Sequence, residues 1–315
     1  MAGDFRPAGE AAADGTPPPV YRGRFAPSPT GPLHFGSLIA ALGSYLDARA
    51  QGGEWRVRIE DVDLPRCPPG MGDAILHTLE AFGFEWTGEV IWQSRRTEAY
   101  SAALETLKAR GLAYACGCSR KEIADSATRP AIDGGLAYPG TCRSGLVPGR
   151  AARAWRLRVP AARIGFCDRL QGEVAQQLED DVGDFVLLRA DGLFAYQLAV
   201  TVDDQFQGIS DIVRGADLLA STPRQLWLQD CLGAPRPRYA HLPVAANAAG
   251  EKLSKQTRAP AIEVATAPAA LCAALRFLGQ PVPDALASAS LATVWEWAFA
   301  HWDFARIPRR PSQPV

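Results

Sequence analysis

The chain has 315 residues and a mass of 33.8 kDa, enough for two or three domains with a sizeable core. Its formal net charge is −1, so a nucleic-acid partner would have to bind a local basic patch rather than an overall positive field. No stretch approaches the roughly 18 apolar residues of a membrane span, and the N-terminus lacks the pattern of a signal peptide. These features exclude membrane-spanning and secreted classes and predict a cytoplasmic protein.

Strands and helices alternate after a leader, residues 1–20, that lacks hydrophobic periodicity and is expected to be disordered. Within residues 21–113 the pattern predicts strands at 20–26 and 55–59 and helices at 35–50, 71–82 and 97–110. Such alternation is typical of an α/β fold with a Rossmann-like, doubly wound parallel sheet. We therefore assign residues 21–113 to the first half of that sheet.

The pattern changes at residues 114–180, where cysteines, Gly/Pro-rich turns and short β-prone segments such as 154–159 predict an inserted subdomain. Residues 181–259 resume the alternation and form the second half of the sheet. Their predicted elements are strands at 185–188 and 209–213 and helices at 196–206 and 221–231, after which residues 239–244 lead into the loop that contains the lysines. The pattern of residues 260–315 is predominantly helical and predicts a short helical stem and tail.

Two separated stretches suit a nucleotide triphosphate. Residues 29–37, PTGPLHFGS, place a Pro/Gly turn, His34 and Gly36 at the start of a predicted helix, where backbone N–H groups attract anions. Residues 251–256, EKLSKQ, hold two of the only four lysines in the chain. Taken alone, a histidine in a turn is more often a surface or capping residue than a catalytic one. A Lys-x-x-Lys motif taken alone usually lies on a solvent-exposed face and binds nothing. In this order around a parallel α/β pattern, they predict one phosphate site.

These stretches resemble the two signatures of the class I aminoacyl-tRNA synthetases, and longer stretches resemble the glutamyl branch of that family. The longer stretches are 24–31, RFAPSPTG, together with 196–204, YQLAVTVDD, and 213–219, VRGADLL. The resemblance covers about residues 21–259. One departure is Ser37, which stands where many members of the class have a second histidine.

The resemblance implies how ATP would be bound. Lys255 would make the main phosphate contact during activation and His34 would lie near the ATP, which makes these two the expected catalytic residues. Further ATP contacts are expected from Gly36, Ser37, Lys252 and Ser254. Mg²⁺ would accompany the ATP, held more by substrate oxygens than by protein. No protein nucleophile is needed, because the glutamate carboxylate itself attacks the α-phosphate.

The charges of glutamate suit Arg24, Arg214 and Glu60, since two carboxylates need cations and one ammonium needs an anion. By the resemblance, Glu60 would bind the α-ammonium and Ser28 would help hold the amino acid. Arg24, Tyr196 and Arg214 would contact carboxylates, with the arginine for each carboxylate left open. The alternatives are a structural ion pair of Arg214 with Asp211 or Asp217, and a surface strand end for Glu60.

Three cysteines in the insert, Cys116, Cys118 and Cys142, offer three thiolates for one structural zinc ion. The C-x-C and Y-x3-C spacing resembles the zinc site of short glutamyl-synthetase paralogues, which implies Tyr138 as the fourth ligand. Cys167 is the alternative fourth ligand. Buried, reduced cysteines without any metal are the other possibility.

The short region after Lys255, about sixty residues, is enough for a helical stem and little else. This length and the zinc spacing resemble the glutamyl-Q tRNA(Asp) synthetase family. The resemblance implies activation of L-glutamate by ATP and its transfer to the queuosine at the wobble position of tRNA(Asp), by a protein expected to be a monomer. The alternatives are a compact glutamyl-tRNA synthetase that charges tRNA(Glu), and a synthetase-like binding paralogue without catalysis.

Overall fold

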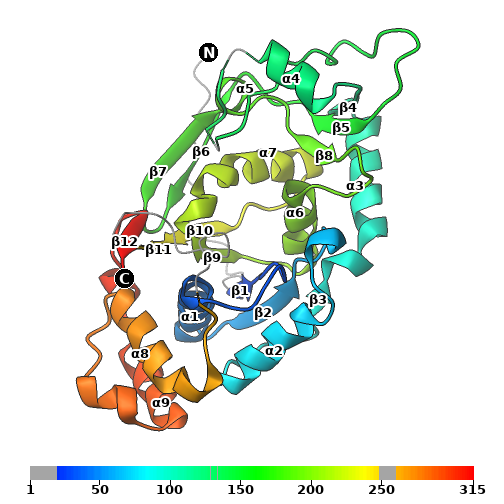
Figure 1. Ribbon diagram of the computed structural model, residues 1–315. Helices are drawn as coiled ribbons and strands as arrows, with labels where there is room; N and C mark the ends of the chain where they lie inside the picture. The colour runs from blue at the N-terminus through cyan, green and yellow to red at the C-terminus, as the bar shows by residue number, and fades with distance from the viewer. Residues whose placement is uncertain (1–19, 128, 133, 248–259) are drawn as a thin grey trace.

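A parallel sheet forms the centre of the protein in the computed structural model, which describes residues 20–127, 129–132, 134–247 and 260–315 (Figure 1). Its strands are β1 (Arg22–Phe25), β2 (Glu54–Ile59), β3 (Ile91–Trp92), β9 (Asp211–Gly215) and β10 (Arg238–Leu242). β2 pairs in parallel with β1 and β3, and β10 pairs in parallel with β9. These pairings form two hydrogen-bonded groups, β1-β2-β3 and β9-β10. Because β9 lies beside β1, the spatial order is β3-β2-β1-β9-β10, which confirms the predicted Rossmann-like arrangement of parallel strands.

The helices of this unit confirm the periodicity of the sequence. They are α1 (Phe35–Ala50), α2 (Met71–Ala81), α3 (Thr97–Ala109), α6 (Tyr196–Phe206) and α7 (Thr222–Leu232). α1 is buried along most of its length and packs on β1 and β9, with Leu38, Leu42 and Tyr45 in the main core. In the described residues, no helix is long and apolar enough to cross a bilayer.

The segment between the two halves of the sheet contains two separate β structures. β4 (Ala113–Cys116), β5 (Ala154–Leu157) and β8 (Val186–Leu188) form an antiparallel sheet next to the short helices α4 (Arg120–Ser126) and α5 (Leu178–Asp181). The strand predicted at 185–188 is therefore present, but its assignment to the parallel sheet is wrong, because it pairs with β5. β6 (Arg163–Asp168) and β7 (Gly172–Gln177) form a hairpin that reaches from α5 to β10 (Figure 1). The hairpin turn is tied to α1, because Arg169 donates two hydrogen bonds of 2.6 and 2.9 Å to Asp47.

The C-terminal part contains α8 (Ala267–Phe277) and α9 (Leu291–His301), which agree with the predicted helical character. α8 packs on α1, so this stem covers the first half of the sheet. A final strand, β12 (Ser312–Pro314), pairs in parallel with β11 (Val244–Ala246). The sequence did not predict this pairing, because a three-residue strand that contains proline carries no β signal of its own.

Candidate active site

The carboxyl ends of β1 and β2 meet where the sequence placed the ligand site. The backbone N–H of Glu60 donates to the Pro27 carbonyl at 2.9 Å, which joins the loop after β1 to the end of β2. Ser28 is exposed on this loop. The alternative of an exposed surface position for Glu60 is wrong, because its side chain is buried.

Four buried charged side chains lie together behind this edge. Arg58 Nη2 lies 3.2 Å from Glu60 Oε1 and 2.9 Å from Asp204 Oδ1, and Arg24 Nε lies 3.2 Å from the same Asp204 oxygen. Burial raises the pKa of Glu60, and the guanidinium groups of Arg58 and Arg24 only partly offset this rise. Burial also opposes ionisation of Asp204, but the same two arginines outweigh it and hold the pKa of Asp204 below its usual value. Two cations and two anions thus compensate one another.

Arg214, at the end of β9, differs from these residues because it is bonded to neutral groups. Its Nε donates to His241 Nε2 at 3.1 Å, and its Nη2 donates to Thr222 Oγ1 at 2.9 Å and to Gln225 Oε1 at 2.8 Å. Within the described residues it forms no ion pair with a carboxylate, and its buried Nη1 has no hydrogen-bond partner. The predicted alternative of an Arg214 ion pair with Asp211 or Asp217 is therefore not what the structure contains.

Tyr196 begins α6 and lies within electrostatic range of the same groups. Burial, followed by the Glu60 carboxylate, raises the pKa of Tyr196 to about 12, while Arg214 and Arg24 act in the opposite direction. The phenol is therefore neutral at physiological pH. The structure brings Arg24, Glu60, Tyr196 and Arg214 into one region, although they come from four different elements.

The predicted phosphate contacts are only partly described. His34 is the N-cap residue of α1, so this helix directs its free N–H groups toward the loop that contains the Pro/Gly turn. Ser37 Oγ accepts from the His34 backbone N–H at 2.8 Å and donates to the His34 carbonyl at 2.9 Å, while Gly36 lies between them in the first turn. Lys252, Ser254 and Lys255 lie outside the described residues.

The three predicted cysteine ligands and Tyr138 meet in the insert. Tyr138 Oη lies 3.4 Å from Cys116 Sγ and 3.6 Å from Cys118 Sγ, and the Sγ atoms of Cys118 and Cys142 are 3.6 Å apart. Tetrahedral zinc with ordinary bond lengths separates two sulfur ligands by about 3.8 Å and a sulfur from an oxygen ligand by about 3.5 Å. The four atoms therefore fit a single tetrahedral metal ion. Cys167 is exposed on β6 and is not part of this cluster.

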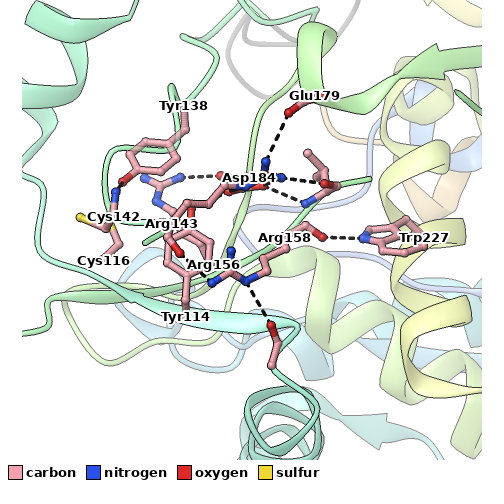
Figure 2. A network of polar contacts seen from close by, with 12 residues as sticks. Tyr114, Cys116, Tyr138, Cys142, Arg143, Arg156, Arg158, Glu179, Asp184 and Trp227 are labelled. Carbon is pink, nitrogen blue, oxygen red and sulfur yellow. Dashed lines mark hydrogen bonds and ion pairs between the residues drawn. The ribbon is translucent and has the colours of Figure 1, made fainter. Parts of the chain in front are cut away.

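A polar network joins the cysteine cluster to the antiparallel sheet (Figure 2). The buried carboxylate of Asp184 accepts hydrogen bonds from Tyr114 Oη at 2.6 Å, from Arg143 Nε and Nη2 at 2.7 and 2.9 Å, and from the Val159 backbone at 2.8 Å. Arg143 directly follows Cys142. The guanidinium carbon of Arg156 lies 3.8 Å from the centre of the Tyr138 ring. This positive charge would offset part of the negative charge that three thiolates and a phenolate bring to a metal.

Comparisons with known proteins show the family of this chain. The family model for the catalytic domain of class I tRNA synthetases (E and Q) matches residues 21–281. A glutamyl-Q tRNA(Asp) synthetase of Dechloromonas aromatica is 72% identical over 92% of this chain and 96% of that protein. The chain belongs to this family. Another member, from Chromobacterium violaceum, is 62% identical over 93% of this chain and 97% of that protein.

Solved structures show the same fold in related synthetases. A glutamate–tRNA synthetase from Elizabethkingia anophelis superposes with a TM-score of 0.77 at 23% identity, over 94% of this chain and 68% of that chain. A glutamate tRNA ligase from Elizabethkingia meningosepticum, solved in complex with its amino acid, gives a TM-score of 0.74 at 25% identity, over 93% of this chain and 66% of that chain. The parallel sheet is thus the synthetase fold.

Sequence reasoning missed four charged or polar residues of this synthetase-like site. Asp204 stands inside one of the stretches that resemble the glutamyl branch, and that position was its only signal. Arg58 alternates with apolar residues in β2 and has the pattern of an exposed position, although it is fully buried. His241 and Asp168 are fully or almost fully buried and bonded to each other, and no local pattern indicates this pairing.

The pH dependence of stability should report the buried His241. Burial, with a further contribution from the Arg214 charge, lowers the pKa of His241 from 6.5 to about 4. The unfolded chain therefore binds one proton more than the folded protein between these values, so stability falls as pH drops from 6.5 toward 4, by up to about 3 kcal/mol. Urea unfolding of the wild type and His241→Gln at several pH values should show this loss only in the wild type. Equal pH dependences of the two proteins would contradict the assignment.

Proposed function

We propose that this protein activates L-glutamate with ATP to form glutamyl-adenylate and transfers the glutamate to queuosine at the wobble position of tRNA(Asp). Relatives that match almost the full chain at 72% and 62% identity carry the name glutamyl-Q tRNA(Asp) synthetase, which supports the proposal. The protein would act in the cytoplasm, where tRNA is modified, and as a monomer.

The observation that carries the proposal is the unsatisfied Nη1 of the buried Arg214. The cluster of Arg24, Arg58, Glu60 and Asp204 sums to zero when all four are ionised. Arg214 adds a positive charge that no carboxylate of the described residues contacts directly, because the Asp168 carboxylate lies beyond His241. L-Glutamate carries one net negative charge at neutral pH. A substrate carboxylate on Arg214 would satisfy both the charge and the missing hydrogen bond, which is worth more in a buried site than in water.

The remaining groups of glutamate would use the neighbouring residues. The α-ammonium would bind Glu60, whose buried carboxylate gains from a second cation, and Tyr196 would donate its phenol hydrogen to a carboxylate. Arg24 would contribute the second positive charge near the carboxylates, and Ser28 would contact the amino acid from the loop after β1. This arrangement leaves one glutamate carboxylate to attack the α-phosphate of ATP.

The nucleotide would lie over the start of α1, against His34, Gly36 and Ser37. Lys255, with help from Lys252 and Ser254, would stabilise the charge that develops on the α-phosphate and the leaving pyrophosphate. Mg²⁺ would enter with ATP on the phosphate oxygens. A hydroxyl of the queuosine ring would then attack the carbonyl carbon of the adenylate, with AMP as the leaving group.

The direct test is transfer of labelled glutamate, with ATP, to tRNA(Asp) that contains queuosine, to the same tRNA without it, and to tRNA(Glu). Only the queuosine-containing tRNA should become labelled, and Lys255→Ala should lower glutamate-dependent pyrophosphate exchange by about 100-fold or more without a change in thermal stability. Labelling of tRNA(Glu) would contradict the proposal in favour of a compact glutamyl-tRNA synthetase. Absence of both exchange and labelling would indicate a binding paralogue.

We also propose that Cys116, Cys118, Cys142 and Tyr138 bind one zinc ion. The spacing of their sulfur and oxygen atoms supports a closed tetrahedral site, which leaves no position for a reactive water and so has a structural role. Bound zinc would stiffen a small lobe whose hydrophobic cluster contains few residues besides these ligands.

Zinc content and cobalt spectra of the purified protein should test this site. We expect one zinc per chain, and Tyr138→Phe should weaken zinc binding by at least about tenfold, because it removes one ligand atom with little change in shape. Cys167→Ser is the matched control and should leave zinc affinity unchanged. A protein that loses zinc through Cys167→Ser but not through Tyr138→Phe would assign the fourth ligand to Cys167.

A further inference from the structure

A chain of three buried side chains leads from the β6–β7 hairpin to Arg214. Asp168 Oδ2 lies 2.6 Å from His241 Nδ1, and His241 Nε2 lies 3.1 Å from Arg214 Nε. All three side chains are at most 5% exposed. Arg214 therefore has an imidazole as its Nε partner, where a buried arginine is more commonly held by a carboxylate.

One arrangement of the hydrogens satisfies both ring nitrogens of His241. Arg214 Nε always carries a hydrogen, so His241 Nε2 must present its lone pair and the ring hydrogen must be on Nδ1. Asp168 Oδ2 accepts that hydrogen and so selects this tautomer. His241 Nε2 also lies 3.2 Å from Thr222 Oγ1, whose hydroxyl can donate to the same lone pair. A ring hydrogen on Nε2 would place two N–H groups against each other at 3.1 Å. His241 thus orients the guanidinium without neutralising its charge.

Asp168 is itself fixed by the turn of the hairpin. Its Oδ1 accepts backbone hydrogen bonds from Leu170 and Gln171, both at 2.9 Å, and from His241 at 3.1 Å. Three N–H groups on one oxygen leave Oδ2 for the imidazole and prevent the carboxylate from rotating. The adjacent Arg169 anchors the same turn to Asp47 of α1.

We propose that Asp168 and His241 are positioning residues that hold Arg214 with its Nη1 directed at the glutamate carboxylate. The inference rests on the proposed function for the role of Arg214 as the substrate contact. A carboxylate in place of His241 would hold Arg214 equally well but would cancel the charge that the substrate needs. The neutral imidazole provides the geometry and keeps the Asp168 carboxylate out of direct contact with Arg214, so the guanidinium can pair with glutamate. The hairpin, which comes from the segment between the two halves of the sheet, is then part of the amino-acid pocket.

Asp168→Asn is the sharpest test, because it changes one atom and reverses one hydrogen bond. The three backbone N–H groups hold the amide oxygen in the place of Oδ1, so the amide NH₂ faces His241 Nδ1 and forces the ring hydrogen onto Nε2, against Arg214. We expect the KM for glutamate in pyrophosphate exchange to rise at least about tenfold. The KM for ATP should change less than about twofold, because the phosphate contacts are made elsewhere.

Gln171→Ala is the matched control from the same turn. Gln171 donates to the His241 backbone carbonyl at 2.8 Å but does not contact the ring, so its loss should leave the KM for glutamate unchanged. An unchanged KM for glutamate in Asp168→Asn, or an equal rise in Gln171→Ala, would overturn the inference.

Nitrogen NMR of the histidine rings provides a measurement that does not depend on activity, and the chain has only four histidines to assign. The wild type should show His241 with its hydrogen on Nδ1, and Asp168→Asn should show it on Nε2. An Nε2–H tautomer in the wild type would overturn the inference even if the variant does not fold. Absence of glutamate-dependent exchange in the wild type, with the expected tautomer, would instead reject the proposed function and leave this arrangement of hydrogens intact.

Discussion

The rest of the site depends on one constraint: a guanidinium group is buried at the end of β9 without a carboxylate partner among the described residues. Burial of a charge is costly unless hydrogen bonds and an opposite charge compensate it. Arg214 donates hydrogen bonds to His241, Thr222 and Gln225, but no carboxylate of the described residues contacts it directly, since Asp168 is separated from it by His241. The pocket is therefore complementary to an anion before any ligand arrives, at a cost to stability that the surrounding fold must offset.

The fold meets this cost by joining residues that are distant in the sequence. The neutral cluster of Arg24, Arg58, Glu60 and Asp204 connects β1, β2 and α6 through buried ion pairs, so the two halves of the sheet are held together at the ligand edge. The β6–β7 hairpin adds Asp168 from the intervening segment. The contacts of Asp204 with Arg24 and Arg58, and of Asp168 with His241, join residues that are far apart in the chain, whereas Arg58 and Glu60 are only two residues apart. The pocket therefore exists only once the whole catalytic unit has formed.

The main helices and parallel strands could be predicted from the sequence. α1, α3 and α6 have clear apolar periodicity, and the longer parallel strands contain residues that favour β structure. Arg24, Glu60, Tyr196 and Arg214 were found through charge complementarity and family resemblance, and the structure brings them together. The contacts of Arg58 with Asp204 and of Asp168 with His241 could not be predicted, since burial of a polar side chain depends on distant partners rather than on local pattern. The β11–β12 pairing was also missed, because each strand is only three residues long and too short to show a β pattern of its own.

The most direct measurement is a crystal structure of the protein with L-glutamate or a non-hydrolysable glutamyl-adenylate analogue. We expect a substrate carboxylate oxygen within hydrogen-bond distance of Arg214 Nη1, with the contact from Arg214 Nε to His241 unchanged and the substrate ammonium beside Glu60. A bound substrate whose carboxylates both lie away from Arg214, or an Arg214 that turns to an ion pair with a protein carboxylate, would contradict this expectation.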